Sequence, residues 1–205
     1  MNRFLVRAAF IVTILLLVMA SSASAIDLGG HDRDGTVIGL TLGYGWNSVD
    51  FTGEDGLSRD TGTIDSFNGG FRVGWAPSDY FIGSIGFYGW KRGFYSWTNF
   101  TIKNYAFMLE GYFFPLGEGF WIKGGVGRGT VDFFGQAALP QNNLIFNETA
   151  WSWSTGAGYE FRVSDGAGIG ISYDVLYIPL GDFDTVTDVS SLTQSVSLNI
   201  HFYMN

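Results

Sequence analysis

Apolar residues alternate with small or polar residues over long runs of this chain, and this alternation limits its folding more than any other feature. In residues 151–163 the odd positions carry mainly aromatic side chains, whereas the even positions carry Ser, Gly and charged residues. The pattern recurs in residues 67–75 and 195–202. A period of two predicts β-strands with unlike faces. The runs are longer than the usual strand of about five or six residues and suit tilted strands that cross a bilayer.

Eight such runs follow one another along the chain, at roughly residues 36–46, 66–76, 79–90, 101–114, 119–129, 149–163, 167–177 and 194–203. Three of the connections are tight turns rich in Pro, Gly, Ser and Asp, at residues 77–78, 115–118 and 164–166. The other four are longer, at residues 47–65, 91–100, 130–148 and 178–193. Because short and long connections alternate, we expect the short turns and both chain ends at one end of the molecule and the long loops at the other.

The composition excludes several classes of protein. The chain is 46% hydrophobic, 18% aromatic and only 15% charged, so it is not a disordered chain, and a soluble domain typically has about 25% charged residues. It contains no Cys, which excludes a disulfide framework, Cys-ligated zinc and a Cys nucleophile. No stretch after the first 25 residues approaches 18 consecutive apolar residues, so we expect no transmembrane helix in the mature chain.

The first 25 residues have the features of a secretory signal peptide. Arg3 and Arg7 give a positive start, residues 8–20 are apolar, and Ala23-Ser24-Ala25 is a small-residue cleavage site. An uncleaved membrane anchor is the alternative, but it requires about 20 apolar residues. We therefore predict an exported mature chain of residues 26–205.

An apolar outward face predicts a closed sheet. In lipid every unpaired backbone N–H or C=O costs several kcal/mol, so such a sheet must close into a barrel. A soluble β-sandwich also has alternating strands, but it does not predict two belts of aromatic residues. Here aromatic residues gather near the short turns and again near the long loops, as expected at two membrane interfaces. The predicted interface belts include Trp46, Trp75, Trp151, Trp153, Tyr173 and Phe202.

With these features the chain resembles the small eight-stranded outer-membrane barrels of the OmpA/OmpX type. The resemblance covers the mature chain through its strand and loop layout, its aromatic belts and the closing strand Val196-x-Leu198-x-Ile200-x-Phe202. It implies an all-β, eight-stranded antiparallel up-and-down transmembrane barrel over residues 26–205. It also implies a location in the bacterial outer membrane, with both termini in the periplasm.

Charged residues also fall on the inward parity of the predicted strands. Two cations and two anions share one depth, four or five residues from the short turns: Arg72, Glu110, Lys123 and Glu160. Charges in a lumen must be paired or hydrated, so we predict an ion-pair layer that closes the lumen. A gate whose pairs exchange partners is the alternative. We favour a static layer because buried pairs are expensive to break.

A second set of cations gathers at the loop ends of three neighbouring strands. Lys91, Lys103 and Arg128 fall on the outward parity, and Arg92 lies beside them. At this level the phosphates of lipopolysaccharide would accept charge-assisted hydrogen bonds from these side chains. Long Lys and Arg side chains also extend (snorkel) toward the membrane–water interface without binding a specific ligand, and this explains the same pattern. We keep both interpretations.

The sequence offers little for catalysis or metal binding. His31 and His201 are the two histidines, and we expect both at the periplasmic end, away from an outer-leaflet substrate. The acidic residues of the first and last long loops do not have the spacing of an EF-hand. We therefore predict no catalytic residues, no metal ligands and no cofactor.

The resulting hypothesis is a monomeric outer-membrane barrel with a structural or surface-interaction role, a closed lumen and acidic external loops. Its expected partners are outer-membrane lipids, lipopolysaccharide, the barrel-assembly machinery and periplasmic chaperones, and we expect no nucleic-acid partner. A narrow channel or transporter for small solutes is one alternative. A lipid A-modifying enzyme is the other.

Overall fold

The computed structural model describes residues 33–53, 55–60, 64–92, 100–117, 119–135, 143–183 and 186–204. These residues form nine strands: β1 (Gly35–Thr52), β2 (Ser58–Asp60), β3 (Ile64–Ser78), β4 (Phe81–Arg92), β5 (Phe100–Phe113), β6 (Phe120–Gly135), β7 (Asn143–Ser164), β8 (Ala167–Phe183) and β9 (Val186–Met204). None of the described residues belongs to a helix long and apolar enough to cross a membrane. The predicted signal peptide, residues 1–25, lies outside the described residues.

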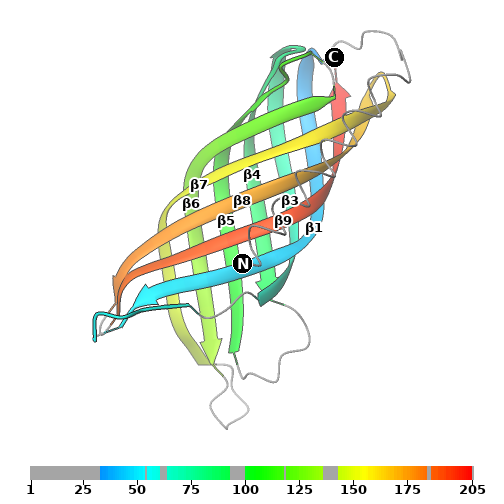
Figure 1. Ribbon diagram of the computed structural model, residues 1–205. Coiled ribbons are helices and arrows are strands. Elements are labelled where there is room, and N and C mark those ends of the chain that lie inside the picture. Colours follow the sequence, from blue (N-terminus) through cyan, green and yellow to red (C-terminus); the bar gives the residue numbers. More distant parts are fainter. Residues whose placement is uncertain are drawn as a thin grey trace, which may run out of the picture. The chain divides into compact units, whose positions relative to one another are not determined.

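The strands close into a barrel. Neighbours in the order β1-β3-β4-β5-β6-β7-β8-β9 pair with each other, and β1 also pairs with β9 (Figure 1). All pairings are antiparallel, and the closing one extends from Thr36 opposite Met204 to Thr52 opposite Thr187. β2 adds only a three-residue pairing to the far end of β1. The prediction of an all-β barrel of eight antiparallel strands is confirmed.

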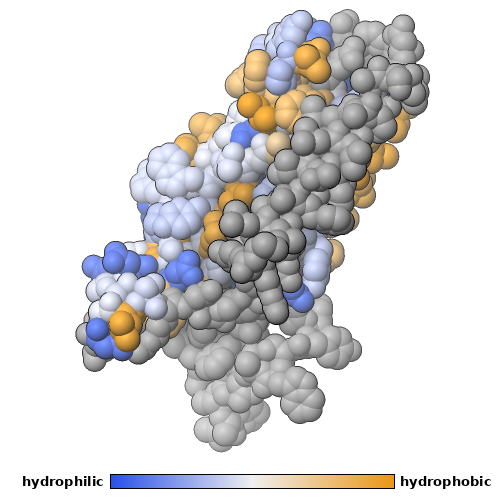
Figure 2. Space-filling view, viewed as in Figure 1, coloured by the Kyte–Doolittle hydropathy of each residue, from blue (hydrophilic) through white to orange (hydrophobic). Residues whose placement is uncertain are grey.

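The alternation in the sequence becomes the two surfaces of the barrel wall. In β5, Met108 and Glu110 are buried, whereas Phe107 and Leu109 are 58% and 62% exposed. The same arrangement, with large apolar side chains outward, holds in β3, β4, β7, β8 and β9. In Figure 2 strongly hydrophilic residues gather at the lower left, at one end of the strands, and pale and orange residues lie along the length of the strands. Outward apolar side chains around a partly polar interior are the reverse of a soluble protein and match a surface that faces lipid.

The short connections are hydrogen-bonded to neighbouring segments. The Phe114 N–H donates to the carbonyl oxygen of Tyr80 at 2.9 Å, and the Tyr203 N–H donates to that of Gly166 at 2.8 Å. Gly117 has a φ of 66°, which glycine adopts without strain and which the turn after β5 requires. These bonds hold the short-turn end of the barrel together.

The strands at the other end, the loop end, are longer than the sequence pattern predicts. The expected seventh connection, 178–193, is largely strand, since β8 continues to Phe183 and β9 begins at Val186. The expected first connection, 47–65, contains the end of β1, all of β2 and the start of β3. The pattern missed these extensions because side chains beyond the membrane no longer need an apolar outward face.

The barrel wall also divides toward the loop end. β7 and β8 pair from Ser164 opposite Ala167 to Trp153 opposite Tyr177. Beyond that point, among the strands that the structure describes, β7 pairs only with β6, to Asn143, and β8 only with β9, to Phe183. Figure 1 shows β7 (yellow) and β8 (orange) diverging there. We call the separated stretches, residues 147–152 of β7 and 178–183 of β8, the open seam.

Candidate functional site

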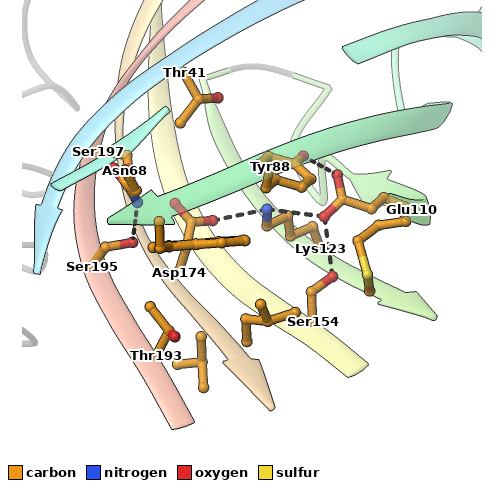
Figure 3. A pocket seen from close by; sticks show the side chains of 14 residues that line it. Thr41, Asn68, Tyr88, Glu110, Lys123, Ser154, Asp174, Thr193, Ser195 and Ser197 are labelled. Atoms are coloured by element: carbon orange, nitrogen blue, oxygen red, sulfur yellow. Dashed lines mark hydrogen bonds and ion pairs between the residues drawn. The ribbon is translucent and has the colours of Figure 1, made fainter. Parts of the chain in front are cut away.

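The interior of the barrel holds a layer of charged groups centred on Lys123. Its Nζ lies 3.1 Å from Glu110 Oε1 and 3.0 Å from Asp174 Oδ1. Glu110 also accepts hydrogen bonds from the hydroxyls of Tyr88, Tyr112 and Ser154. Figure 3 shows Lys123 reaching between the two carboxylates. β5, β6 and β8 thus each contribute one charge to this group.

Arg72 and Glu160, the other two residues of the predicted ion-pair layer, are also buried. They are joined through His201, whose Nε2 contacts the Arg72 guanidinium and whose Nδ1 contacts a Glu160 carboxylate oxygen. Because arginine only donates hydrogen bonds, Nε2 must accept and Nδ1 must carry the proton given to Glu160. Arg72 also donates to the Tyr112 hydroxyl at 2.7 Å. The structure therefore places the four predicted residues in two groups, Lys123–Glu110 and Arg72–His201–Glu160, which meet at Tyr112.

Arg33, which precedes the first strand, belongs to the same network. It is 2% exposed, and its Nη1 donates to the carbonyl oxygens of Asp79 at 3.0 Å and Gly117 at 2.5 Å. Its Nε lies 3.7 Å from Glu160, and its guanidinium stacks 3.9 Å from the centre of the Phe114 ring. Arg33 thereby closes the short-turn end over Glu160.

Apolar clusters lie on both sides of the charged layer. Toward the loop end the cluster comprises Val49, Tyr88, Trp90, Ala106, Met108, Val131, Leu176, Ile178 and Val189. Toward the short turns it comprises Val37, Ala76, Ile82, Tyr112, Phe114, Trp121 and Tyr203. The inward parity of the strands predicts the charged layer and does not predict these apolar clusters. Consecutive apolar pairs such as Phe107-Met108 and Tyr177-Ile178, which interrupt the alternation, are the sequence signal for these clusters.

The remaining space in the charged layer is small. The cavity beside Lys123 and Asn68 measures about 20 Å³ of space open to the centre of a water molecule. A cavity needs about 10–15 Å³ on this measure to hold one water. The space beside Arg72, Tyr112 and His201 is too narrow for any. The described side chains therefore leave little free space at these two places in the charged layer.

The outward cations do not form one compact cluster. Lys91 and Lys103 face each other across β4 and β5. On β6 the residue opposite Lys103 is Asp132, and Arg128 lies four positions from Asp132, about 13 Å along the strand. Its guanidinium lies 5.6 Å from the centre of the Trp151 ring. Arg92 ends β4, and its side chain is outside the described set.

The predicted interface aromatics differ in their exposure. Trp75, Trp151, Trp153 and Phe202 are exposed on the outer surface. Trp46 and Tyr173 are half-buried, and the Tyr173 hydroxyl donates to Gln194 on the neighbouring strand β9. The structure thus places four of the six on the open outer surface and packs the other two partly against neighbouring side chains.

The geometry shows little that could support catalysis. His201 is 2% exposed and engaged on both ring nitrogens, whereas His31 lies outside the described residues. Within the described ranges no group of three or more His, Cys, Asp or Glu side chains is arranged to hold a metal ion. The site is best described as an ion-paired barrel interior flanked by two apolar clusters.

Comparison with known proteins agrees with this architecture. A family model described as the outer membrane protein beta-barrel domain matches residues 13–202. The crystal structure of Neisserial surface protein A has 13% identity and a TM-score of 0.53, with 83% of this chain and 98% of that chain covered. The attachment invasion locus protein Ail of Yersinia pestis has 20% identity and a TM-score of 0.52, with 82% and 99% covered.

Ail in complex with the heparin analogue sucrose octasulfate gives 19% identity and a TM-score of 0.50, over the same shares of the two chains. At these identities the likeness concerns the fold alone. No curated protein matches the sequence.

Proposed function

Because this chain belongs to the outer-membrane β-barrel family and is therefore a protein of the bacterial outer membrane, we propose that it is a structural and surface-interaction barrel with a closed lumen. The observation that carries the proposal is the filling of the interior. Two apolar clusters enclose a charged layer whose free space is about 20 Å³, room for one water molecule. A hydrated ion needs a continuous wet path, and the small spaces beside Lys123 and Arg72 among the described side chains support a closed lumen.

Planar-bilayer recording tests the closed lumen. The full chain should give no large steady conductance. A Met108→Ala/Tyr112→Ala variant, which removes one inward side chain from each apolar cluster, should conduct. Val196→Ala, on the outward face of β9, is the matched control and should behave as the unmodified protein. A large steady conductance in the unmodified protein would support the channel alternative and end this proposal.

The proposal places the loop end outside the cell and the short turns in the periplasm. Short periplasmic turns and long external extensions are the usual arrangement of such barrels. Insertion would depend on the barrel-assembly machinery and periplasmic chaperones, and the working form would be a monomer. Sedimentation of the refolded protein in detergent tests the monomer.

Lipopolysaccharide is the proposed lipid partner of Lys91, Arg92, Lys103 and Arg128. Lys91 and Lys103 lie directly opposite each other on β4 and β5, and Asp132 lies opposite Lys103 on β6. A phosphate at this level would accept charge-assisted hydrogen bonds from the two lysines. Arg128 lies far enough away to meet a second phosphate. Lipopolysaccharide should raise the midpoint of heat unfolding more for the unmodified protein than for a Lys91→Ala/Lys103→Ala/Arg128→Ala variant. Equal protection, or equal protection by dephosphorylated lipopolysaccharide, would remove this partner.

The proposal includes no catalytic role. Its support is the interior position of His201, shielded from any outer-leaflet substrate. Mass spectrometry of lipid A from cells with and without the protein should show the same species. A new species would establish the enzyme alternative.

A further inference from the structure

The open seam leaves two strand edges that face each other without pairing. If the β7–β8 register continued beyond Trp153 and Tyr177, Ser152 would lie opposite Ile178, and position 147 opposite position 183. No such pairing forms, and among the described strands β7 is bonded there only to β6 and β8 only to β9. Each stretch therefore has one row of backbone N–H and C=O groups directed away from its own hairpin. Ser152 and Ile178 are buried, so the edges open to a partner are those beyond them, toward residues 147 and 183.

The sequence of β8 explains why the strands separate. Pro179 has no N–H to give to a ladder, and proline within a sheet is confined to edges and bulges. The β8–β9 register shifts on both sides of Gly181, whose φ is 86°. Bulges twist and bend a strand. The separation is thus encoded in β8 itself.

The seam opens at the level of the outer aromatic belt. Trp151 and Trp153 on β7 and Tyr177 on β8 are exposed where pairing stops. Within hydrocarbon each unpaired backbone group would cost several kcal/mol, so these edges belong on the water side of the interface. This step rests on the orientation proposed above, with the loop end outside.

The charges on the two stretches themselves are negative, and Arg128, which stacks on Trp151 from the neighbouring strand β6, is the cation beside them among the described residues. Glu148 and Asp182 are exposed, one on each stretch, and Asp182 accepts a 3.0 Å hydrogen bond from the backbone N–H of Asp188 on β9. Neither stretch contains Lys or Arg. A cationic partner is therefore attracted to this position, and a polyanion is repelled.

We propose that the open seam is a docking site for an extended, basic segment of a partner protein, which binds by strand addition. Main-chain hydrogen bonds to an unpaired edge supply affinity in this mode of recognition. Glu148, Asp182 and Asp188 select for lysine or arginine on the incoming strand. The ligand class is thus a basic β-strand, distinct from the lipid partner of the cations on β4 to β6.

A labelled peptide of alternating Val and Lys tests the proposal, with the full chain refolded in nanodiscs of neutral phosphatidylcholine. The peptide should bind, and deuterium exchange should slow at the amides of residues 147–152, 178–183 or both. The same peptide with alternate backbone nitrogens methylated keeps its charge but cannot complete a ladder, and it should bind at least about tenfold more weakly, as expected from losing several hydrogen bonds.

Matched variants separate charge from fold. Glu148→Gln/Asp182→Asn should weaken binding several-fold, whereas Asp34→Asn/Asp165→Asn, which removes the same charge from exposed positions at the short-turn end, should not. Absence of binding, equal binding of the methylated peptide, or equal binding to protein-free nanodiscs would each overturn the proposal. None of these outcomes bears on the lumen, because a conducting barrel would still present the same edges.

Discussion

Arg33 and Gly117 are 84 positions apart in the chain, yet Arg33 Nη1 donates a 2.5 Å hydrogen bond to the Gly117 carbonyl oxygen. The same nitrogen reaches the carbonyl oxygen of Asp79 at 3.0 Å. One side chain therefore connects the turn after β3 with the turn after β5. It also places its charge beside the buried carboxylate of Glu160.

Replacing Arg33 by Ala should lower the free energy of unfolding by about 1–3 kcal/mol, because two carbonyl groups and Glu160 lose a buried donor. Urea titration of the protein in lipid vesicles measures this loss. The neighbouring Asp34 is exposed, and Asp34→Ala should change stability by less than about 0.5 kcal/mol. If both variants unfold at the same urea concentration, Arg33 does not stabilise the short-turn end.

Replacing Lys123 by Met should be more damaging, at about 3–5 kcal/mol, because the buried Glu110 and the half-buried Asp174 would lose their shared cation. Adding Glu110→Gln and Asp174→Asn to the same protein should recover most of this loss. The comparison uses the same urea titration. A triple variant no more stable than the single one would show that the ion pairs are not the source of the effect.

Two glycines in the barrel wall should respond oppositely to alanine. A Cβ at Gly39 would lie 2.6 Å from Cγ of Arg72, so Gly39→Ala should force Arg72 to move and cost about 1–3 kcal/mol. A Cβ at Gly124 would meet nothing within 4 Å. Gly124→Ala should leave stability unchanged or raise it by up to about 1 kcal/mol. Equal shifts in the midpoint of heat unfolding would contradict the inner packing described for Arg72.

Tryptophan fluorescence should report which side of the wall each ring occupies. Trp75, Trp151 and Trp153 are exposed, whereas Trp90 and Trp121 are 7% and 1% exposed. In single-tryptophan variants, lipids with brominated acyl chains should quench the first three strongly and the last two weakly. If Trp121 were quenched as strongly as Trp75, the inward position of the Trp121 ring would be wrong.

The faces of the strands could be predicted from the sequence because a lipid-facing wall imposes a strict period of two. Arg72, Glu110, Lys123 and Glu160 all point inward, as their parity indicates. Their partners could not be predicted in the same way. Parity gives the side of the wall on which a residue lies, but the pairing inside a lumen depends on side-chain reach across strands far apart in sequence, as with Lys123 and Asp174.

Arg33 and the open seam escaped prediction for other reasons. Arg33 lies before the first periodic run, where no repeat marks it as buried. The seam depends on where pairing between β7 and β8 stops, and the parity of a strand does not show where its pairing ends. Pro179 was its one local signal.

Because Thr36 near the start of the barrel is bonded beside Met204 near its end, the ring cannot be completed before the last strand has been delivered. Until the end of the chain has been synthesised, β1 lacks its partner β9, and the earlier strands expose apolar surface. Contacts between such distant segments form slowly. Maturation of this protein therefore hinges on one late event, and a fragment lacking either end would be left as an open sheet.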